Sequence, residues 1–359
     1  MWSDGARAES VLAGAAAACD AQLRYWAGQL TGTVGQVAAH QFGWSGAGAG
    51  PGAAEPRQGG KKVRAALALS CARAVGGDPQ RAVPAAVVVE LVHNLSLLYD
   101  DVLDGDAVRR HRAAAWEVFG PAAATRSADA LLLLAFEVLG GPGAEAVGGA
   151  QAGGEAVAEA ASKALLDTLI QLAVGEGLDV LFEAEPRIGL SECLEMVSGK
   201  TASLISCACR LGALHGGGGP EQVELLAAFG HDLGMAFQLV DDLLGIWGDE
   251  ARTGKPVFAD LRARKLSVPV VAAMASGTAA GEELARRYTA PGGPDRSGEA
   301  ELAGLVEEAG GRRWTEERAA GYADAARDRL RSLAERSGAV PEAVEDLDAL
   351  CGLIVNRSH

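Results

Sequence analysis

The sequence predicts an all-α protein that forms a single large helical bundle, and three observations support this fold class. Alanine, leucine, glutamate and arginine, which are good helix formers, dominate the composition. Runs of alternating β-branched residues, which are typical of strands, are scarce. Most segments between the glycine-rich stretches carry apolar residues at three- and four-residue spacing, and several are apolar nearly all round, as expected inside a bundle.

The chain has 359 residues, more than most single domains, but a large helical domain reaches this length. Stretches rich in glycine, proline or alanine predict loops at residues 43–60, 140–154 and 290–299. None of them separates regions of different composition, so we expect one domain over residues 1–359. The periodicity predicts helices, in chain order, at 61–77, 83–103, 125–139, 155–184, 190–214, 221–248, 266–276, 302–308 and 315–336.

The composition argues against several classes of function. A net charge of −15 is unsuited to general nucleic-acid binding, which needs a basic face. The six cysteines form no CxxC pair, which favours free buried thiols in a reducing cytoplasm. The most apolar long stretch, residues 82–99, contains Glu90 and His93, so it predicts a core helix rather than a membrane span. We therefore expect a cytoplasmic protein without a membrane span.

Four carboxylates lie within seven residues directly after an apolar helical segment: Asp100, Asp101, Asp104 and Asp106. Like charges at this density repel one another, and a carboxylate at the end of a buried helix is costly unless a cation neutralises it. A solvated helix end is the simpler explanation. The alternative is a site for a hard divalent cation with an anionic ligand, since Asp100 and Asp104 lie one helical turn apart on the same face.

A second aspartate pair, Asp241 and Asp242, also follows an apolar helical segment. If the two helices pack as neighbours, the carboxylates converge, and such oxygen ligands suit Mg²⁺ that bridges carboxylates to substrate phosphates. Phosphate also needs cations. Lys61 and Arg64 lie three residues apart on one face of the helix predicted at 61–77. Further cations near small residues or near the first aspartates are Arg109, Arg110, Lys200, Lys255 and Lys265.

These elements occur in the order of known motifs. The segments GGKKVRA, ELVHNLSLLYDDVLDGDAVRR, SGKT and FQLVDDLLG, followed by GKP and RK, resemble the motifs of trans-isoprenyl diphosphate synthases in the polyprenyl synthetase family. The likeness covers about residues 60–269, with a motif-bearing core at about 59–270, and the chain resembles geranylgeranyl diphosphate synthases. It implies the isoprenoid-synthase helical fold with a central apolar cavity, Mg²⁺ as cofactor and a homodimer. The implied substrates are isopentenyl diphosphate and an allylic diphosphate (dimethylallyl, geranyl or farnesyl).

The resemblance also assigns roles to individual residues. Those implied to bind Mg²⁺ are Asp100, Asp104 and Asp241, with Asp101 and Asp242 beside them. Those implied to hold the allylic diphosphate are Arg109, Lys200, Thr201, Gln238, Lys255 and Lys265. Those implied to hold isopentenyl diphosphate are Lys61, Arg64, His93 and Arg110. The implied catalytic set is Asp100, Asp101, Asp104, Asp241 and Lys200. Without the resemblance, His93 in its apolar helix reads more simply as a core histidine.

The residue types agree with this chemistry. Ionisation of an allylic diphosphate creates a carbocation and a highly charged leaving group. Mg²⁺ and lysines stabilise that charge without a protein nucleophile. Apolar helix walls shield the carbocation from water.

The sequence departs from the family's motifs at several positions. Gly245 stands where the second motif usually has a third aspartate, and Asp249, eight residues after Asp241, is a candidate substitute two helical turns on. The remaining departures are Ala65 for proline, Ala114 for threonine, Phe258 for glycine and Glu176 for glutamine. These changes leave most metal and phosphate residues intact.

Product length is expected to depend on the residues one turn before Asp100. Leu95 and Ser96 lie there, about 6–7.5 Å back along the helix axis, where short-chain members of the family often carry Phe or Tyr. Both side chains are smaller, so a fifteen-carbon product should pass this level. Val92 and Leu91, one turn further, are bulky enough to prevent very long chains. The sequence thus predicts mainly a twenty-carbon product, geranylgeranyl diphosphate.

Two other functions remain open on the sequence. One is a class I terpene cyclase on the same fold, which needs only one diphosphate; the complete second diphosphate set argues against it. The other is a weakly active regulatory subunit of a prenyl synthase. The intact DDVLD segment opposes that reading, whereas Gly245 and Phe258 favour it.

Overall fold

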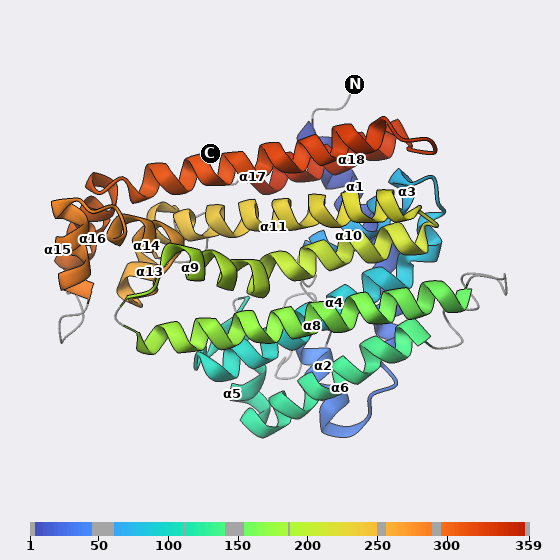
Figure 1. Cartoon of the computed structure of the whole chain (residues 1–359). Coiled ribbons are helices and arrows are strands. Elements are labelled where there is room, and N and C mark those ends of the chain that lie inside the picture. The colour runs from blue at the N-terminus through green and yellow to red at the C-terminus, as the bar shows by residue number, and fades with distance from the viewer. Residues whose placement is uncertain are drawn as a thin grey trace. The chain divides into compact units, whose positions relative to one another are not determined.

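The computed structural model describes residues 4–44, 61–110, 112–140, 154–185, 187–249, 256–288 and 296–355. Most of these residues are helical (Figure 1), which confirms the all-α prediction. The α-helices are α1 (Asp4–Ala27), α2 (Gly32–Gln41), α3 (Val63–Ala74), α4 (Val83–Leu103), α5 (Ala115–Phe119), α6 (Pro121–Gly140), α8 (Gly154–Ala184), α9 (Leu190–Val197), α10 (Ser203–His215), α11 (Pro220–Trp247), α13 (Ala259–Arg262), α14 (Val268–Met274), α15 (Ala279–Tyr288), α16 (Arg296–Glu308), α17 (Gly311–Ala334) and α18 (Pro341–Val355). The other elements are the 3-10 helix η1 (Pro79–Ala82), the π-helical turn η2 (Ser198–Ala202) and the antiparallel strands β1 (Val108–Arg109) and β2 (Arg112–Ala113).

The chain divides into two compact units. Unit 1 comprises Met1–Leu165, Cys207–Glu224 and Arg336–Leu347. Unit 2 comprises Leu166–Ser206, Leu225–Glu335 and Asp348–His359. A single domain over residues 1–359 stays a prediction.

Unit 1 is organised around α4. This helix begins with Pro84 in its first turn, where proline costs no hydrogen bond, and it ends at Leu103, so its bounds are those that the periodicity predicted. It packs against α3 and α6, and most of its residues up to Leu98 are buried on every side. The prediction of an apolar core helix at this place is confirmed.

Unit 2 contains two apolar clusters. One joins α9, α11 and α14 through residues such as Val197, Leu239 and Val271. The other joins the end of α11 to α15 and α16 and includes Ile246 and Leu284. Together they fix the C-terminal half of α11, which carries the second aspartate pair.

Several predicted bounds differ from the structure. The helix predicted at 61–77 begins only at Val63, and the one predicted at 190–214 is interrupted by η2. Helices α1, α2, α5, α13, α15 and α18 were not predicted. The loop predicted at 290–299 is wrong from Arg296 onward, where α16 begins. Most of the other two predicted loops, and residues 289–295, lie outside the described residues.

Two helical segments, Pro79–Leu103 and Pro220–Trp247, are long and apolar enough to cross a membrane by length and composition alone. Of their most apolar windows, 72% and 61% respectively is buried inside the protein. Core helices of soluble proteins have the same property, so this finding is only weak evidence for a membrane span.

Candidate active site

The first aspartates lie at the C-terminal end of α4. Asp104 caps this helix, and its N–H donates to the carbonyl of Asp100 at 2.8 Å, which places the two residues one turn apart, as predicted. Asp100 is half-buried and Asp104 is exposed. Carboxylates at a helix C-terminus face the negative end of the helix dipole, so this arrangement is unfavourable until a cation binds.

Asp101 has a different environment from its two neighbours. It is buried, and the Nε of Arg109 in β1 donates to its Oδ1 at 2.7 Å. Its other oxygen, Oδ2, is buried without a hydrogen-bond partner. Burial raises the pKa of this carboxyl despite the Arg109 hydrogen bond, and the charges of Asp106 and Asp104 raise it further. Arg109, which was predicted as a diphosphate ligand, is therefore hydrogen-bonded to Asp101 in the structure.

The residues predicted to hold isopentenyl diphosphate belong to unit 1. Arg64 lies in the first turn of α3 and has a buried Nε without a hydrogen-bond partner. Arg64 and Arg110 act on His93 of α4: burial first, and then these positive charges, hold the pKa of His93 well below its usual range. His93 is therefore neutral at pH 7. An unpaired guanidinium donor among positive charges is suited to an anion.

Lys61 does not share a helix face with Arg64. Lys62, in a left-handed conformation (φ 51°), is the cap of α3, so Lys61 precedes the helix, where it is exposed. The interpretation of one helix face was wrong because the helix begins two residues later. Lys62 is instead buried, with its Nζ 3.1 Å from Asp20 and 3.7 Å from Glu90. The sequence alone does not show which of the two adjacent lysines is buried.

Lys200 lies in unit 2, in the π-helical turn η2. Such turns often occur at functional sites. The backbone of α8 lies directly against this turn: a Cβ built on Gly175 would lie 2.3 Å from the backbone nitrogen of Lys200. The Lys200 Nζ lies 2.7 Å from both Glu176 and Asp179 of α8. Glu176, at the position where glutamine is usual, thus adds a second negative partner to this lysine.

A chain of hydrogen bonds connects η2 to the second aspartate pair. The Thr201 hydroxyl donates to Gln238 Oε1 at 2.7 Å, and Gln238 Nε2 donates to Asp242 Oδ1 at 2.8 Å. The N–H of Val268 donates to the other Asp242 oxygen at 2.9 Å. Burial raises the pKa of Asp242 to about 7, and the charges of Asp260 and Asp241 add to this. Both Asp242 oxygens thus have protein partners, whereas Asp241 is exposed.

The remaining predicted cations lie after α11. Lys265 is exposed, and its N–H donates to the carbonyl of Asp260 at 2.9 Å. Lys255 lies outside the described residues. Phe258 has φ 64°, which explains why glycine is usual at this position: only glycine adopts a left-handed backbone without cost.

The donors fit Mg²⁺. They are carboxylate oxygens, which this hard cation prefers. Among the described residues, no group of three or more His, Cys, Asp or Glu side chains is placed to hold a metal. Mg²⁺ is commonly held by one or two carboxylates, with substrate phosphates and water completing its shell. Asp100 with Asp104, and Asp241, match this sparse protein contribution.

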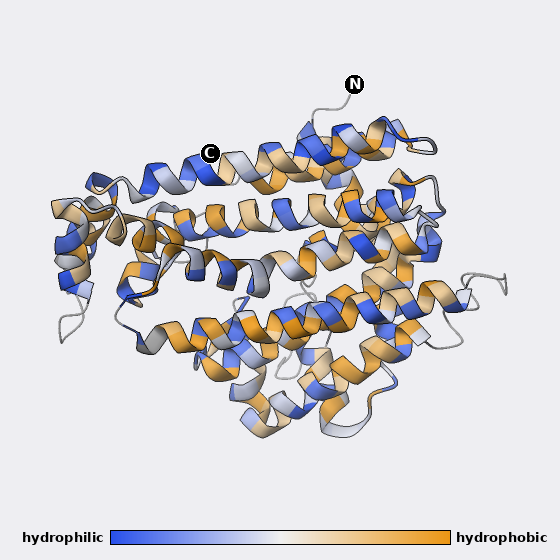
Figure 2. Cartoon of the chain, in the orientation of Figure 1, coloured by the Kyte–Doolittle hydropathy of each residue, from blue (hydrophilic) through white to orange (hydrophobic). Residues whose placement is uncertain are grey.

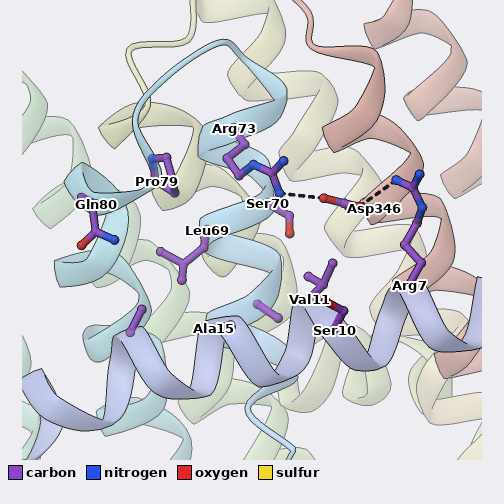
Figure 3. Close-up of a pocket in the computed structure, with 13 residues that line it drawn as sticks. Arg7, Ser10, Val11, Ala15, Leu69, Ser70, Arg73, Pro79, Gln80 and Asp346 are labelled. Atoms are coloured by element: carbon purple, nitrogen blue, oxygen red, sulfur yellow. Dashed lines mark hydrogen bonds and ion pairs between the residues drawn. The ribbon is translucent and has the colours of Figure 1, made fainter. Parts of the chain in front are cut away.

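A pocket of about 470 Å³ lies elsewhere in unit 1, between α1, α3, η1 and α18 (Figure 3). Arg7 and Arg73 approach Asp346 from its two sides, at 2.9 and 2.7 Å. Both guanidinium groups therefore already have a carboxylate partner. The pocket contains none of the predicted site residues.

A comparison with protein families decides the identity of the chain. The sequence model described as polyprenyl synthetase matches residues 53–302. The chain belongs to the polyprenyl synthetase family. It is 41% identical over 295 residues to (2E,6E)-farnesyl diphosphate synthase of Mycobacterium tuberculosis, covering 81% of the chain and 78% of the relative. It is 44% identical over 252 residues to geranylgeranyl diphosphate synthase of the same species, covering 70% and 69%.

Solved structures agree with this assignment. The crystal structure of polyprenyl synthetase from Streptomyces coelicolor A3(2) matches with a TM-score of 0.86 and 39% identity, over 96% of this chain and 99% of that one. The chain is accordingly a prenyltransferase with the isoprenoid-synthase helical fold. The family resemblance predicted from the motifs is confirmed.

Asp104→Ala should abolish turnover by this protein without unfolding it. The substitution removes a carboxylate predicted to hold the metal, and it relieves the like-charge repulsion that acts on Asp101. We expect a melting temperature no lower than that of the wild type, measured by circular dichroism. Activity above about a tenth of wild type, a barrier change below roughly 1.4 kcal/mol, would contradict a metal-binding role.

Glu176→Gln should lower the KM for the allylic diphosphate, because Lys200 loses a negative partner. Partly exposed ion pairs contribute up to about 1 kcal/mol, so the decrease should be up to about fivefold. Steady-state kinetics measures it. Glu195→Gln, with the same charge change on an exposed position of α9, is the control. A raised KM would instead show that Glu176 positions Lys200 for substrate.

Proposed function

We propose that this chain condenses isopentenyl diphosphate with an allylic diphosphate, that Mg²⁺ is its cofactor, and that geranylgeranyl diphosphate is its main product. The observation that carries the proposal is the placement of Asp100 and Asp104 one turn apart at the C-terminal end of a buried helix. The farnesyl and geranylgeranyl diphosphate synthases among the relatives support a short linear product.

The residues of the chain suit the steps of this reaction. When bound, Mg²⁺ supplies Lewis-acid stabilisation of the departing diphosphate. Lys200 donates to diphosphate oxygens once it leaves Glu176 and Asp179, and so stabilises the same charge. Neutral His93 retains one N–H donor, which together with the unpaired Arg64 Nε binds the diphosphate of isopentenyl diphosphate.

Product analysis tests the proposed reaction. The purified protein is incubated with Mg²⁺ and geranyl or farnesyl diphosphate, first alone and then with isopentenyl diphosphate. We expect linear prenyl diphosphates only when both substrates are present. A hydrocarbon formed from the allylic diphosphate alone would indicate a cyclase. Failure to turn over under either condition would indicate a regulatory subunit.

Ser96→Phe should shorten the product towards fifteen carbons. In the structure Leu95 is buried, and half-buried Ser96 donates its hydroxyl to the His93 carbonyl of its own helix at 3.0 Å. Ser96 therefore presents little volume beyond its Cβ, and a phenylalanine there would fill space available to the growing chain. Chromatography of the dephosphorylated products measures the length. Ser96→Ala, which removes only the hydroxyl, should leave the product length unchanged. A product of unaltered length from Ser96→Phe would show that other residues limit the length of the chain.

The proposed homodimer has a candidate contact surface on α8. Leu166, Ile170, Val174 and Leu181 follow one face of this helix, and each has about half or more of its surface exposed (51%, 56%, 54% and 63%). Figure 2 shows hydrophobic residues recurring along α8. Four large apolar side chains on one exposed helix face are unusual unless a partner covers them, and a second copy presents the same stripe.

Ile170→Glu should therefore convert the dimer into a monomer, because it places a charge in the centre of the apolar stripe. Sedimentation velocity at micromolar concentration measures the mass. Val118→Glu, at an exposed apolar residue of α5, is the control and should leave the dimer intact. A wild-type monomer, or an Ile170→Glu protein with unchanged mass, would contradict this surface.

A further inference from the structure

Lys62, to which the family resemblance assigns no role, lies between two residues that it does assign to isopentenyl diphosphate, Lys61 and Arg64. It caps α3 with a left-handed backbone (φ 51°) and is only 7% exposed. Lysines are almost never fully buried unless they are paired, and a left-handed backbone is costly for residues other than glycine. The surroundings of Lys62 must therefore supply the contacts that hold it in this conformation.

Two carboxylates hold the charged end of the Lys62 side chain. Its Nζ lies 3.1 Å from Asp20 Oδ1 of α1 and 3.7 Å from Glu90 Oε2 of α4. The side chains of Lys62 and Glu90 are both almost fully buried, whereas that of Asp20 is partly exposed. The pair with Glu90 is thus shielded from water, and the ammonium group connects the start of α3 to two other helices.

Two aromatic rings that directly follow α2 lie against the same lysine. The rings of Phe42 and Trp44 are stacked, with centroids 4.5 Å apart and 13° between their planes. Lys62 Nζ lies over the Phe42 ring, 5.8 Å from its centroid, and the guanidinium of Arg24 in α1 lies over the Trp44 ring at 4.9 Å. Each ring therefore has a cation over it, an attraction that strengthens where water is excluded. Phe42 is buried, so this condition is met at Lys62.

Glu90 connects Lys62 to other residues that are predicted to bind isopentenyl diphosphate. It precedes His93 by three residues in α4, so the two share a helix face. Burial lowers the pKa of Arg64 and of Arg110, and the negative charge of Glu90 opposes the decrease in both. Glu90 therefore acts on both arginines as well as on Lys62. A displaced Lys62 would alter both the charge balance around Arg64 and the path of the backbone that leads into α3.

We propose that Lys62 is a positioning residue for isopentenyl diphosphate: Asp20, Glu90 and the stacked rings of Phe42 and Trp44 hold its side chain, and the cap held in this way sets the directions of Lys61 and Arg64. Lys62 acts through its neighbours in the chain, because two carboxylates already occupy its ammonium group. This inference rests on the proposed function, since it concerns how one of the two proposed substrates is bound.

The first test loosens Lys62 without changing it. Asp20→Asn removes one carboxylate, and Phe42→Leu removes the ring beneath the ammonium group. Each should raise the KM for isopentenyl diphosphate about fivefold, which corresponds to roughly 1 kcal/mol. The KM for the allylic diphosphate should change less than about twofold. Glu9→Gln and Tyr25→Leu, at exposed positions of α1, are the matched controls and should change neither value.

The second test separates positioning from stability. Lys62→Met keeps the length of the side chain but leaves Glu90 buried without this cation, so the melting temperature should fall. Adding Glu90→Gln removes that unpaired charge and should recover most of the melting temperature. The KM for isopentenyl diphosphate should stay raised about tenfold in both proteins, because neither can hold the cap. Lys62→Arg keeps the charge and should stay within about threefold of the wild type.

Several outcomes would overturn the positioning role and leave the proposed function standing. A lower KM for isopentenyl diphosphate in Asp20→Asn would show that Lys62, once released, binds the diphosphate itself. Recovery of this KM together with the melting temperature in the Lys62→Met, Glu90→Gln protein would show a role in stability alone. Unchanged values in the first test, or an equal rise of both KM values, would also contradict it. A wild type that forms no linear prenyl diphosphate would instead overturn the proposed function and this inference together.

Discussion

The central constraint on the structure is the placement of several carboxylates at the C-terminal end of α4, a helix that is buried almost everywhere else. α4 packs against its neighbours on every side up to Leu98 and then ends in aspartates. The buried part fixes the position of the helix end to within the tolerance of core packing. The negative end of the helix dipole adds to the repulsion among these carboxylates, and a bound cation would relieve both. The C-terminal end of α4 is therefore held rigidly and is favourable for a cation, two properties that a metal site requires.

The two aspartate pairs have the same arrangement of one anchored and one more exposed carboxylate. In both pairs the second residue is anchored by the protein: Asp101 by Arg109, and Asp242 by Gln238 and Val268. The first residue of each pair, Asp100 or Asp241, is more exposed. The anchored residue orients the end of its helix, and its neighbour keeps more contact with solvent. A DD sequence at a helix end thus places a carboxylate with protein partners next to a more exposed one.

The sequence predicted the features that depend on local periodicity, and missed those that depend on distant segments. The bounds of α4 and the one-turn spacing of Asp100 and Asp104 follow from apolar spacing and helix geometry alone. The Glu176 partner of Lys200 and the place of Asp260 beside Gly245 depend on how separate elements pack, which no local pattern encodes. The alanine-rich helix α1 was missed because small residues give a weak apolar contrast.

The π-helical turn η2 has a consequence for the register of the helices that flank it. A π turn holds more residues than an α turn, and each additional residue rotates everything after it by about 100° around the axis. Before the turn, α9 directs Cys193 and Val197 into one apolar cluster of unit 2, and the turn sets the register of the residues that follow it in α10. Deleting a single residue from Ser198–Ala202 would convert the turn into regular α-helix. Every side chain of one flanking helix would then face a new direction, so the length of this segment is as constrained as its composition.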